Sequence, residues 1–511
     1  MSGYSDAGAS FTKRALREFN AQSMSAVEDI DFNNFTLRQR ARMLYMASPI
    51  AASAINTNRT KIVGKGLRLK CNIDHDLLGI TPEAAKEWSR RTEAEFSLWC
   101  KRGINCDALG ANNFYELQAL ICKSWLMSGD VFIALKHVEG TTLNPYSLRL
   151  HVIEADRICT PGSGGLMYGP TEGVTTDGHK IHDGVEVDEN GKIIAFHVCK
   201  IYPGQASIDL NDWVRVTVVG EKTGTPNILQ VMDPERPDQY RGVSYLSPVI
   251  EMILQTRRYT ESELMAALVQ TYFTVFIKTN TDGAAMPFVG DDNDDDDSEE
   301  RYDKDPKLGP ANVMHLLPGE EADFAEPKIP TAGFETFVKM VLKQIGAGLE
   351  MPYDVLVKEF NSSYSASKGA LEEAWEAVRM RRQWLVTDFC QPVYETWLAE
   401  AVALGRIQCP GFFTDPLIRD AWCGSRWDGP AQTHLDPLKE AKANVLLVAN
   451  GWKTNEQITR EFYGENWEEN MQKLTEENKL KNEVIPPVDL SLFTEDDDTD
   501  EEDESNGEDN A

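Results

Sequence analysis

The sequence lacks any apolar run long enough to cross a membrane. A transmembrane helix needs about 18 or more mostly apolar residues, and no such run occurs in the 511 residues. The first residues, "MSGYSDAGASFTKRALREF", also lack the apolar stretch of a signal peptide. We therefore expect a protein that is made in the cytoplasm and has no membrane partner.

The sequence also lacks the cysteine and histidine patterns that bind metal ions or form disulfides. The nine cysteines contain no C-x-x-C pair, which predicts reduced thiols and not a disulfide framework or a zinc site. His179 and His182 are the one close histidine pair, and they lie in the polar stretch "TTDGHKIHDG" with no cysteine nearby. A solvated loop explains them better than a metal site. We predict no metal ion and no cofactor.

Basic residues are few beside the acidic ones. The chain has 51 Lys and Arg against 82 Asp and Glu, a net charge of −31. Much of the excess lies in two tracts: "DDNDDDDSEE" at 291–300 holds eight acidic residues, and Glu483 to Asp509 holds 13 with no Lys or Arg. Such tracts repel themselves and usually stay disordered. The first tract lacks the glycine and glutamate of a calcium loop, so we predict a solvated loop and a solvated tail.

The first half of the chain carries both helical and β patterns. Residues 36–64 predict two helices with a break at Pro49, and 82–100 and 113–129 predict amphipathic helices. Four short β-branched segments follow, separated by Gly, Pro and Asp turns: 130–138, 148–158, 192–201 and 213–220. A hydrophobic content of 41% and 11 tryptophans indicate a folded protein of roughly two to four domains. The fold class predicted is α+β.

Long amphipathic helices dominate the second half. We expect helices at 245–273, 334–350, 365–404 with a kink at Pro392, and within 436–480. The second of these has apolar residues at i, i+3, i+4 and i+7. The packing positions predicted there are Phe337, Val338, Val341, Leu342 and Ile345. One chain offers such stripes few partners, so neighbouring copies are expected to cover them.

No catalytic pattern is complete. Ser365-x-x-Lys368 resembles the start of a penicillin-binding motif, but the matching Lys222-Thr223-Gly224 precedes it in the chain and no S-D-N triplet occurs. A serine hydrolase thus stays an alternative with little support, and Ser365 as a helix cap is simpler. The phosphate loop G-x-x-x-x-G-K-[ST] is absent as well. We predict no catalytic residues and no enzyme activity.

A loop of small polar residues precedes the third long helix. Short polar side chains and a lysine suit weak contact with a sugar–phosphate backbone, without base reading. The residues predicted to touch DNA in this way are Asn361, Ser362, Ser363, Tyr364, Ser365, Ser367 and Lys368. Lys339 and Lys343 share a polar helix face and add two cations. A scaffold that never meets DNA remains the other alternative.

Six stretches of the sequence, in order, resemble the lambda-type portal family of tailed phages. They are "LRQRARMLYMASPIAASAINTNRTKIVGKGLRL", "GVEVDENGKIIAFHV", "DPERPDQYRGVSYLSPVIEMI", "GAGLEMPYDVLVKEFNSSYSASKGALEEAWEAVRMRR", "SRWDGP" and "DPLKEAKA". The resemblance covers residues 35 to 480. It implies a homo-oligomeric ring, usually dodecameric, at one capsid vertex of the virion, through which double-stranded DNA is packaged and ejected. It also implies as partners the terminase large subunit, capsid or scaffold proteins, and head-completion proteins.

The same resemblance implies a division of the chain into the parts of a portal subunit. These are a flexible arm (1–35), an α+β wing (36–244), a first stem helix (245–272), a clip (273–333), a second stem helix (334–349), a tunnel loop (350–366), a long kinked helix with the wing return (367–435), a helical crown (436–480) and a disordered acidic tail (481–511). Lys339 and Lys343 would face the channel.

Overall fold

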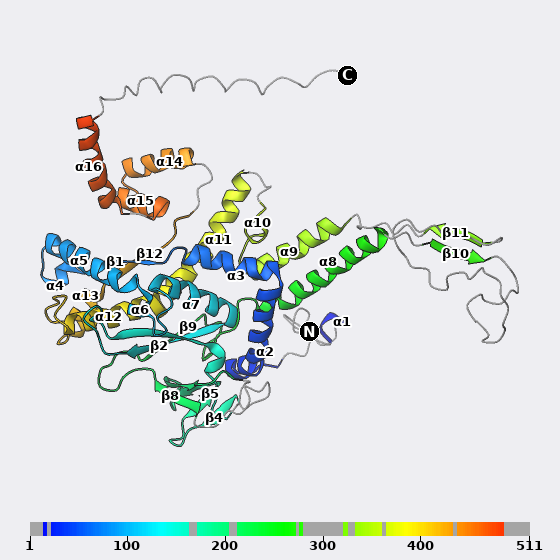
Figure 1. Ribbon diagram of the computed structural model, residues 1–511, viewed down its shortest axis with the longest axis horizontal. Coiled ribbons are helices and arrows are strands. Elements are labelled where there is room, and N and C mark those ends of the chain that lie inside the picture. The colour runs from blue at the N-terminus through cyan, green and yellow to red at the C-terminus, as the bar shows by residue number, and fades with distance from the viewer. Residues whose placement is uncertain are drawn as a thin grey trace, which may run out of the picture. The chain divides into compact units, whose positions relative to one another are not determined.

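The chain forms two units in the computed structural model (Figure 1). The described residues are 14–17, 22–162, 171–203, 212–271, 275–279, 320–324, 333–359, 364–432, 437–464 and 466–484. The first unit ends at Gly429 and the second begins at Pro430. The acidic run 291–300 and the acidic tract beyond Val484 lie outside the described residues.

The first unit begins with helices α1 (Arg14–Arg17), α2 (Ala26–Ala47) and α3 (Pro49–Ile62). A capping box starts α2: the Glu28 amide donates to the Ser25 hydroxyl at 3.3 Å, and the Ser25 amide donates to the Glu28 carboxylate at 3.0 Å. Pro49 is the first residue of α3, where its missing N–H leaves no bond unmade. The break predicted at Pro49 is confirmed as the junction of two helices.

Four more helices follow: α4 (His75–Leu78), α5 (Pro82–Cys100), α6 (Gly103–Cys106) and α7 (Phe114–Ser128). The apolar face of α5 enters the core, where Phe96 and Trp99 are buried and stack with ring centroids 5.6 Å apart. Phe96 also meets Phe114 of α7 and Trp397 edge-on, at 5.6 and 5.0 Å. The amphipathic helices predicted here are confirmed.

Two antiparallel sheets come next. The first, in the order β3-β2-β9, contains β2 (Asp130–His137), β3 (Leu148–Glu154) and β9 (Ile228–Met232). The second follows chain order and contains β4 (Glu172–Val174), β5 (Lys180–His182), β6 (Val185–Val187), β7 (Ile193–Cys199) and β8 (Trp213–Thr217). The predicted α+β class is confirmed.

Strand β2 has a core on each of its faces. Val131 and Ile133 belong to the large core shared with the helices, whereas Phe132 points to a smaller core against the second sheet. There Phe132 meets Phe196 of β7 with ring centroids 5.1 Å apart. The alternating side chains of β2 thus join the helices to the second sheet. Figure 1 shows β2 and β9 between the helices and the second sheet.

Two short strand pairs join distant parts of the chain. β1 (Arg68–Cys71) pairs with β12 (Ser425–Asp428), and β10 (Val275–Thr279) pairs with β11 (Glu320–Phe324), both antiparallel. Single turns of 3₁₀ helix occur at Ala155–Arg157 and Ser247–Val249.

The helices of the second half are α8 (Ile250–Thr271), α9 (Phe334–Gly348), α10 (Tyr353–Val357), α11 (Tyr364–Leu385), α12 (Gln391–Ala403) and α13 (Pro416–Cys423). The helix begins at Tyr364, so Ser365 lies inside its first turn. The prediction that Ser365 caps this helix is wrong, because a cap residue precedes the first helical one.

A π-helical turn, Val386–Cys390, joins α11 to α12. Pro392 at the start of α12 has no N–H for the usual backbone bond, and the Gln391 amide reaches five residues back to the Val386 carbonyl. Buried residues recur here every four positions: Leu385, Phe389, Val393, Trp397 and Ala401. In a regular α-helix, each step of four residues turns the side chain by about 40° around the helix axis. The π turn advances less around the axis per residue, so it offsets part of this rotation and keeps the side chains closer to the core. The predicted kink at Pro392 is therefore a widened turn just before it.

All nine cysteines are free thiols, as predicted. Eight are buried, among them Cys122, and burial raises the pKa of the Cys122 thiol to about 12. These thiols act as small apolar side chains of the core.

The second unit consists of α14 (Pro437–Ala449), α15 (Asn455–Tyr463) and α16 (Trp467–Val484). Its described helices leave many large apolar side chains exposed, among them Leu438, Val445, Leu446, Trp452 and Tyr463. None of the helices in the described ranges has the length and apolar character needed to span a bilayer.

A buried ionic cluster fixes α2 to the first sheet. The Arg241 guanidinium is fully buried and donates to Asp130 at 2.6 Å and to Asp183 at 2.8 Å. Arg38 of α2 is also buried and donates to Asp183 at 3.1 Å. Asp31, about two helical turns before Arg38, is buried beside this cluster, and its Oδ2 has no hydrogen-bond partner within the described part of the chain. Burial and the Asp183 charge raise the pKa of Asp31 to about 7, against the opposing pull of Arg241 and Arg38.

This raised pKa predicts how stability varies with pH. The folded chain keeps a proton on Asp31 between pH 4 and pH 7, where the unfolded chain has lost it, so the free energy of unfolding falls as pH rises through this window. The shift from 3.8 to about 7 corresponds to a loss of about 4 kcal/mol. Asp31→Asn should abolish that loss in urea unfolding measured from pH 4 to pH 8.

The matched control is Asp29→Asn, since Asp29 is on the same helix but 43% exposed in an ion pair with Arg236. This variant should keep the wild-type pH slope. An unchanged slope in Asp31→Asn would mean that Asp31 is ionised in the folded chain.

Candidate functional site

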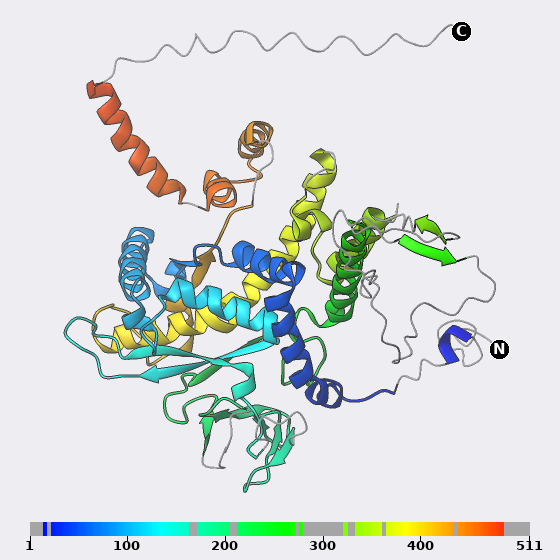
Figure 2. The same ribbon diagram turned by 45° about the vertical axis from the view of Figure 1, so that its right-hand side comes forward.

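Helices α8 and α9 lie side by side as an arm in both views of the chain (Figure 1 and Figure 2). The Tyr259 ring of α8 packs on Phe334 and Phe337 near the start of α9, with centroids 5.5 and 5.2 Å away. At the other end, a Cβ on Gly348 would lie 3.0 Å from the Val249 side chain, just before α8. The two helices are therefore antiparallel, with one end at the core of the first unit.

The five predicted packing positions of α9 fall into three environments. Leu342 and Ile345, near the core end, are buried. Val338 and Val341 are half-buried against the large core. Phe337 is 53% exposed despite its contact with Tyr259. The stripe thus changes from buried to exposed along the arm.

The turn after α9 depends on a glycine. The Met351 amide donates to the Gly346 carbonyl at 2.9 Å, and a Cβ at Gly346 would lie 2.5 Å from the Met351 carbonyl oxygen. Glu350 in this turn has a φ of 48°, in the left-handed region that non-glycine residues rarely adopt. The Tyr245 hydroxyl donates to the Leu349 carbonyl. Tertiary contacts therefore hold a tight, strained reversal between α9 and α10.

Arg381 of α11 is the centre of these contacts. Its side chain is buried, and its Nη2 donates to the Glu350 carboxylate at 2.6 Å. Its guanidinium lies 4.9 Å from the centre of the Tyr245 ring, and its Nη1 donates to the buried Asn58 of α3 at 3.5 Å. One buried cation therefore connects α3, the residues before α8, the α9–α10 turn and α11. Sequence patterns did not single out Arg381, because its partners are far from it in the chain.

The two lysines predicted to face a channel differ in environment. Lys339 forms ion pairs with Glu335 at 2.8 Å and Glu359 at 3.8 Å. Glu359 in turn accepts from the Tyr353 hydroxyl at 2.9 Å. Lys343, one helical turn later, is exposed and lines a cavity. Most of the Lys339 charge is thus balanced within the chain, and no sequence pattern pointed to Glu359 as its partner.

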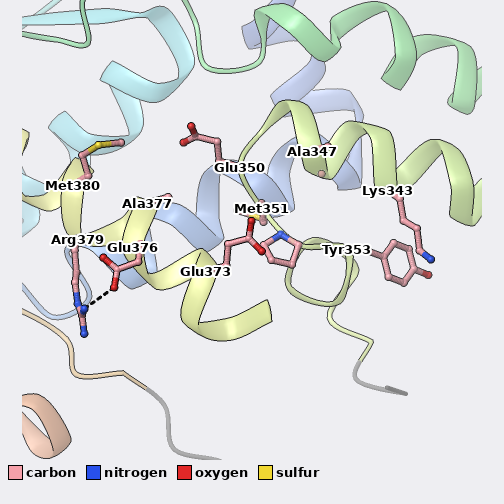
Figure 3. A pocket seen from close by; sticks show the side chains of 12 residues that line it. Lys343, Ala347, Glu350, Met351, Tyr353, Glu373, Glu376, Ala377, Arg379 and Met380 are labelled. Carbon is pink, nitrogen blue, oxygen red and sulfur yellow. Dashed lines mark hydrogen bonds and ion pairs between the residues drawn. The ribbon is translucent and has the colours of Figure 1, made fainter. Parts of the chain in front are cut away.

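The cavity has a volume of about 850 Å³ and lies between α9, α10 and α11 (Figure 3). Its charged lining consists of Lys343, Glu350, Glu373, Glu376 and Arg379. Arg379 and Glu376 pair with each other at 2.8 Å, as the dashed line in Figure 3 marks. The lining therefore has more negative than positive groups and does not attract phosphate.

The predicted tunnel-loop residues are only partly placed. Asn361, Ser362 and Ser363 lie outside the described residues, and of Tyr364 and Ser365 only the helical backbone is described. Ser367 is buried, and Lys368 is half-buried and already engaged in an interaction within the chain. Their contact with DNA stays a prediction.

The motifs that suggested other chemistry have structural roles. Lys222, Thr223 and Gly224 form an exposed turn, closed by a bond from the Gly220 amide to the Thr225 carbonyl at 2.9 Å. Lys222-Thr223-Gly224 thus belongs to the connection between β8 and β9.

The histidine pair is divided between two contacts. His179 and His197 each bond the buried Glu186, at 3.0 and 3.1 Å, and Arg215 donates to it at 2.7 Å. Burial opposes ionisation of Glu186, but the bonds from Arg215 and His179 outweigh it and lower its pKa to about 2. His182 instead stacks on Tyr240 with centroids 5.4 Å apart. In the described part of the chain, no group of three or more His, Cys, Asp or Glu side chains is arranged to hold a metal ion.

Comparison with known proteins gives the family. Residues 12–382 match the family described as phage portal protein, lambda family. The chain is 25% identical to the portal protein of Escherichia phage N15 over 474 residues, which covers 89% of this chain and 86% of that protein. It is also 25% identical to portal protein B of Escherichia phage lambda over 472 residues, covering 89% and 85%. A probable portal protein of Halomonas phage phiHAP-1 is 24% identical over 80% of this chain and 73% of its own length.

Solved structures resemble the chain only distantly. A chain from the neck of a native GTA particle, computed with C12 symmetry, is 10% identical with a TM-score of 0.43 and covers 84% of this chain and 92% of its own length. An HK97-family phage portal protein from Corynebacterium diphtheriae is 11% identical with a TM-score of 0.31 and covers 74% and 93%. The family match spans more than half of the 511 residues, and this chain therefore belongs to the lambda family of phage portal proteins.

Proposed function

We propose that copies of this chain close into a ring, dodecameric as in the family, through which double-stranded DNA enters and leaves the capsid. The observation that carries this proposal is the uncovered end of the α8–α9 arm. The chain buries the core end of the arm itself, whereas the far end exposes large apolar side chains on both helices: Leu264, Met265, Leu268, Phe337 and Met340. Contiguous exposed apolar surface of this kind marks an interaction site.

In a closed ring of identical copies, each copy can cover this surface of its neighbour, so that no copy is left with the surface exposed. When one face of a subunit binds a different face of the next, the contact repeats around an axis and closes as a ring. The arm offers two different faces, one on α8 and one on α9. Membership of the portal family favours such a ring over an open filament.

The arm occupies the place in the sequence where portal proteins have their stem. We assign α8 and α9 to the stem, 36–244 and 367–435 to the wing, 273–333 to the clip, 350–366 to the tunnel loop and 436–480 to the crown. The clip would meet the terminase large subunit during packaging and head-completion proteins afterwards, and capsid or scaffold proteins would meet the ring during assembly. This role is structural and requires no catalysis.

Contact with the passing duplex would be weak. Lys339 is neutralised by Glu335 and Glu359, and Lys343 stands beside a cavity rich in carboxylates. Each phosphate contact that remains would contribute little binding free energy, and this contribution would fall as the salt concentration rises. A channel lined in this way would centre DNA without holding it.

Met265→Asp should prevent ring assembly while the single chain stays folded. Met265 is 63% exposed in the chain, so the change removes little of its own core, but in the ring it would place an unpaired charge against apolar side chains. The cost, on the order of several kcal/mol per contact, repeats around the ring. Native mass spectrometry and electron microscopy would measure the assembled fraction.

Ser262→Asp is the control, since Ser262 is an exposed polar residue of the same helix and the change adds the same charge. It should assemble as the wild type does. Normal rings from Met265→Asp would show that this face is not covered by a neighbour, and a wild-type chain that stays monomeric at all salt concentrations would refute the ring.

A triple variant tests the channel contact. Replacing Lys339, Lys343 and Lys368 with alanine should leave ring assembly intact and lower the amount of nuclease-protected DNA per capsid, by a modest factor because Lys339 is already paired. Unchanged packaging would favour a scaffold that does not touch DNA through these residues.

A further inference from the structure

Acidic residues are absent from a long stretch of this acidic chain. Between Asp31 and Asp74 the sequence contains no Asp or Glu, while Arg and Lys occur at eight positions: 38, 40, 42, 59, 61, 65, 68 and 70. Arg38 and Arg42 pair with carboxylates of the first sheet region, and Lys70 pairs with Glu93. The cations around the end of α3 take no part in these ion pairs.

These remaining cations lie on α3, on the turn after it, at the start of β1 and on α7. We call the set of Arg59, Lys61, Lys65, Arg68 and Lys123 the α3 strip. In the described ranges, none of the five forms an ion pair with a carboxylate, although the chain has 82 acidic residues. Lys65 and Arg68 are exposed and the other three are half-buried. Burial without a counter-charge lowers the pKa of Lys61.

Two packing contacts place α3 beside α7. At one end, Lys123 of α7 lies over the Tyr45 ring, 5.1 Å from its centre, and the Tyr45 hydroxyl donates to Asn56 of α3 at 3.3 Å. At the other end, Gly66 lies against the Tyr115 ring near the start of α7. Helices α3 and α7 therefore run antiparallel side by side. Arg59 and Lys123 lie near the Tyr45 hydroxyl, whereas Lys61, two residues after Arg59, leaves α3 on another side.

Arg382 of α11 holds the end of α3. Its Nε donates to the Ile62 carbonyl at 3.0 Å and its Nη2 to the Lys61 carbonyl at 2.7 Å, which satisfies the last carbonyls of α3. Burial and the nearby Arg379 lower the pKa of Arg382 to about 10, against the opposing pull of Asp428. The backbone that carries Lys61 is therefore fixed against α11.

We propose that the α3 strip is a second phosphate-binding surface, which holds the backbone of duplex DNA outside the predicted tunnel loop. The inference rests on the proposed function only for the choice of DNA as the anion. Polar donors accompany the cations, namely Tyr45, Asn56 and Thr60, and such groups position a sugar–phosphate backbone without reading bases.

A second copy of the chain fits the strip less well than DNA. Protein–protein interfaces bury an apolar centre within a polar rim. Between Met46 and Leu77, no large apolar side chain is exposed, in a part of the chain that is described without a gap. On α7, Leu120 is 42% exposed, three residues before Lys123, but one such side chain is not the apolar centre of a protein interface. A surface of unpaired cations with so little apolar area is typical of contacts with nucleic acid.

The test compares two triple variants of the full chain. The first, Lys61→Gln with Lys65→Gln and Arg68→Gln, removes three cations of the strip. The control, Lys101→Gln with Lys136→Gln and Lys222→Gln, removes three exposed cations elsewhere and changes the net charge equally. Binding of a fluorescent duplex of arbitrary sequence is measured by anisotropy over a series of salt concentrations, with thermal melting and ring assembly measured alongside.

The strip variant should bind the duplex more weakly, and the slope of log K against log salt should fall by about one to three, since each lost phosphate contact contributes about 0.9. The control should keep the wild-type slope. Equal binding by both variants would overturn the proposal. So would a strip variant that fails to form rings yet binds DNA normally, because the cations would then pair with carboxylates of a neighbouring copy.

The outcome is separable from that of the proposed channel. The variant of Lys339, Lys343 and Lys368 should retain the salt slope of the strip whatever its effect on packaging. Loss of the ring in Met265→Asp likewise leaves duplex binding by single chains measurable.

Discussion

The buried guanidinium of Arg381 is the contact on which the arrangement of the first unit depends. It bonds the Glu350 carboxylate, packs on the Tyr245 ring and reaches Asn58. These partners belong to segments that are far apart in the sequence, and the surfaces proposed to act lie on the elements they join: α3 carries the strip, α9 is part of the arm, and α11 lines the cavity. A buried cation that loses its partners is costly, so these surfaces keep fixed positions relative to one another. As a lambda-family portal protein, the chain is a component of the virion.

The distribution of carboxylates decides which cations are available to a partner. Arg38, Arg241 and Arg215 are held by buried aspartates or Glu186, and Lys339 is held by Glu335 and Glu359. Their charges serve folding. Most of the α3 strip lies in residues 32–73, which contain no acidic residue, and in the described part of the chain none of its five cations pairs with a carboxylate. An overall charge of −31 therefore says little about where the surface is positive.

Much of the fold followed from local patterns, and much of the site did not. Apolar periodicity located α5, α7, α8 and α9, and Pro49 located the junction of α2 and α3. The π turn escaped prediction, although the four-residue spacing from Leu385 to Ala401 contained its signal, because a proline inside a helix was taken to kink it. The partners of Arg381 and Lys339 could not be predicted, since pairing between distant segments depends on tertiary packing and not on spacing. Ser365 looked like a cap because its neighbours are small and polar, but the helix starts one residue earlier.

The π turn at Val386–Cys390 has a mechanical consequence for the long helix that contains it. Backbone bonds that span five residues are less favourable than those of an α-helix, so bending the rod costs least at this point. On one side α12 is locked among the aromatic rings of the core through Tyr394 and Trp397. On the other side α11 leads back to the segment predicted to line the pore. Force applied to that segment would first meet Trp375, Val378 and Arg381 of α11, which are buried on the inner side of the joint. The π turn therefore lies between two anchored stretches of helix, and the anchors on its inner side would take up the force before it reached the joint.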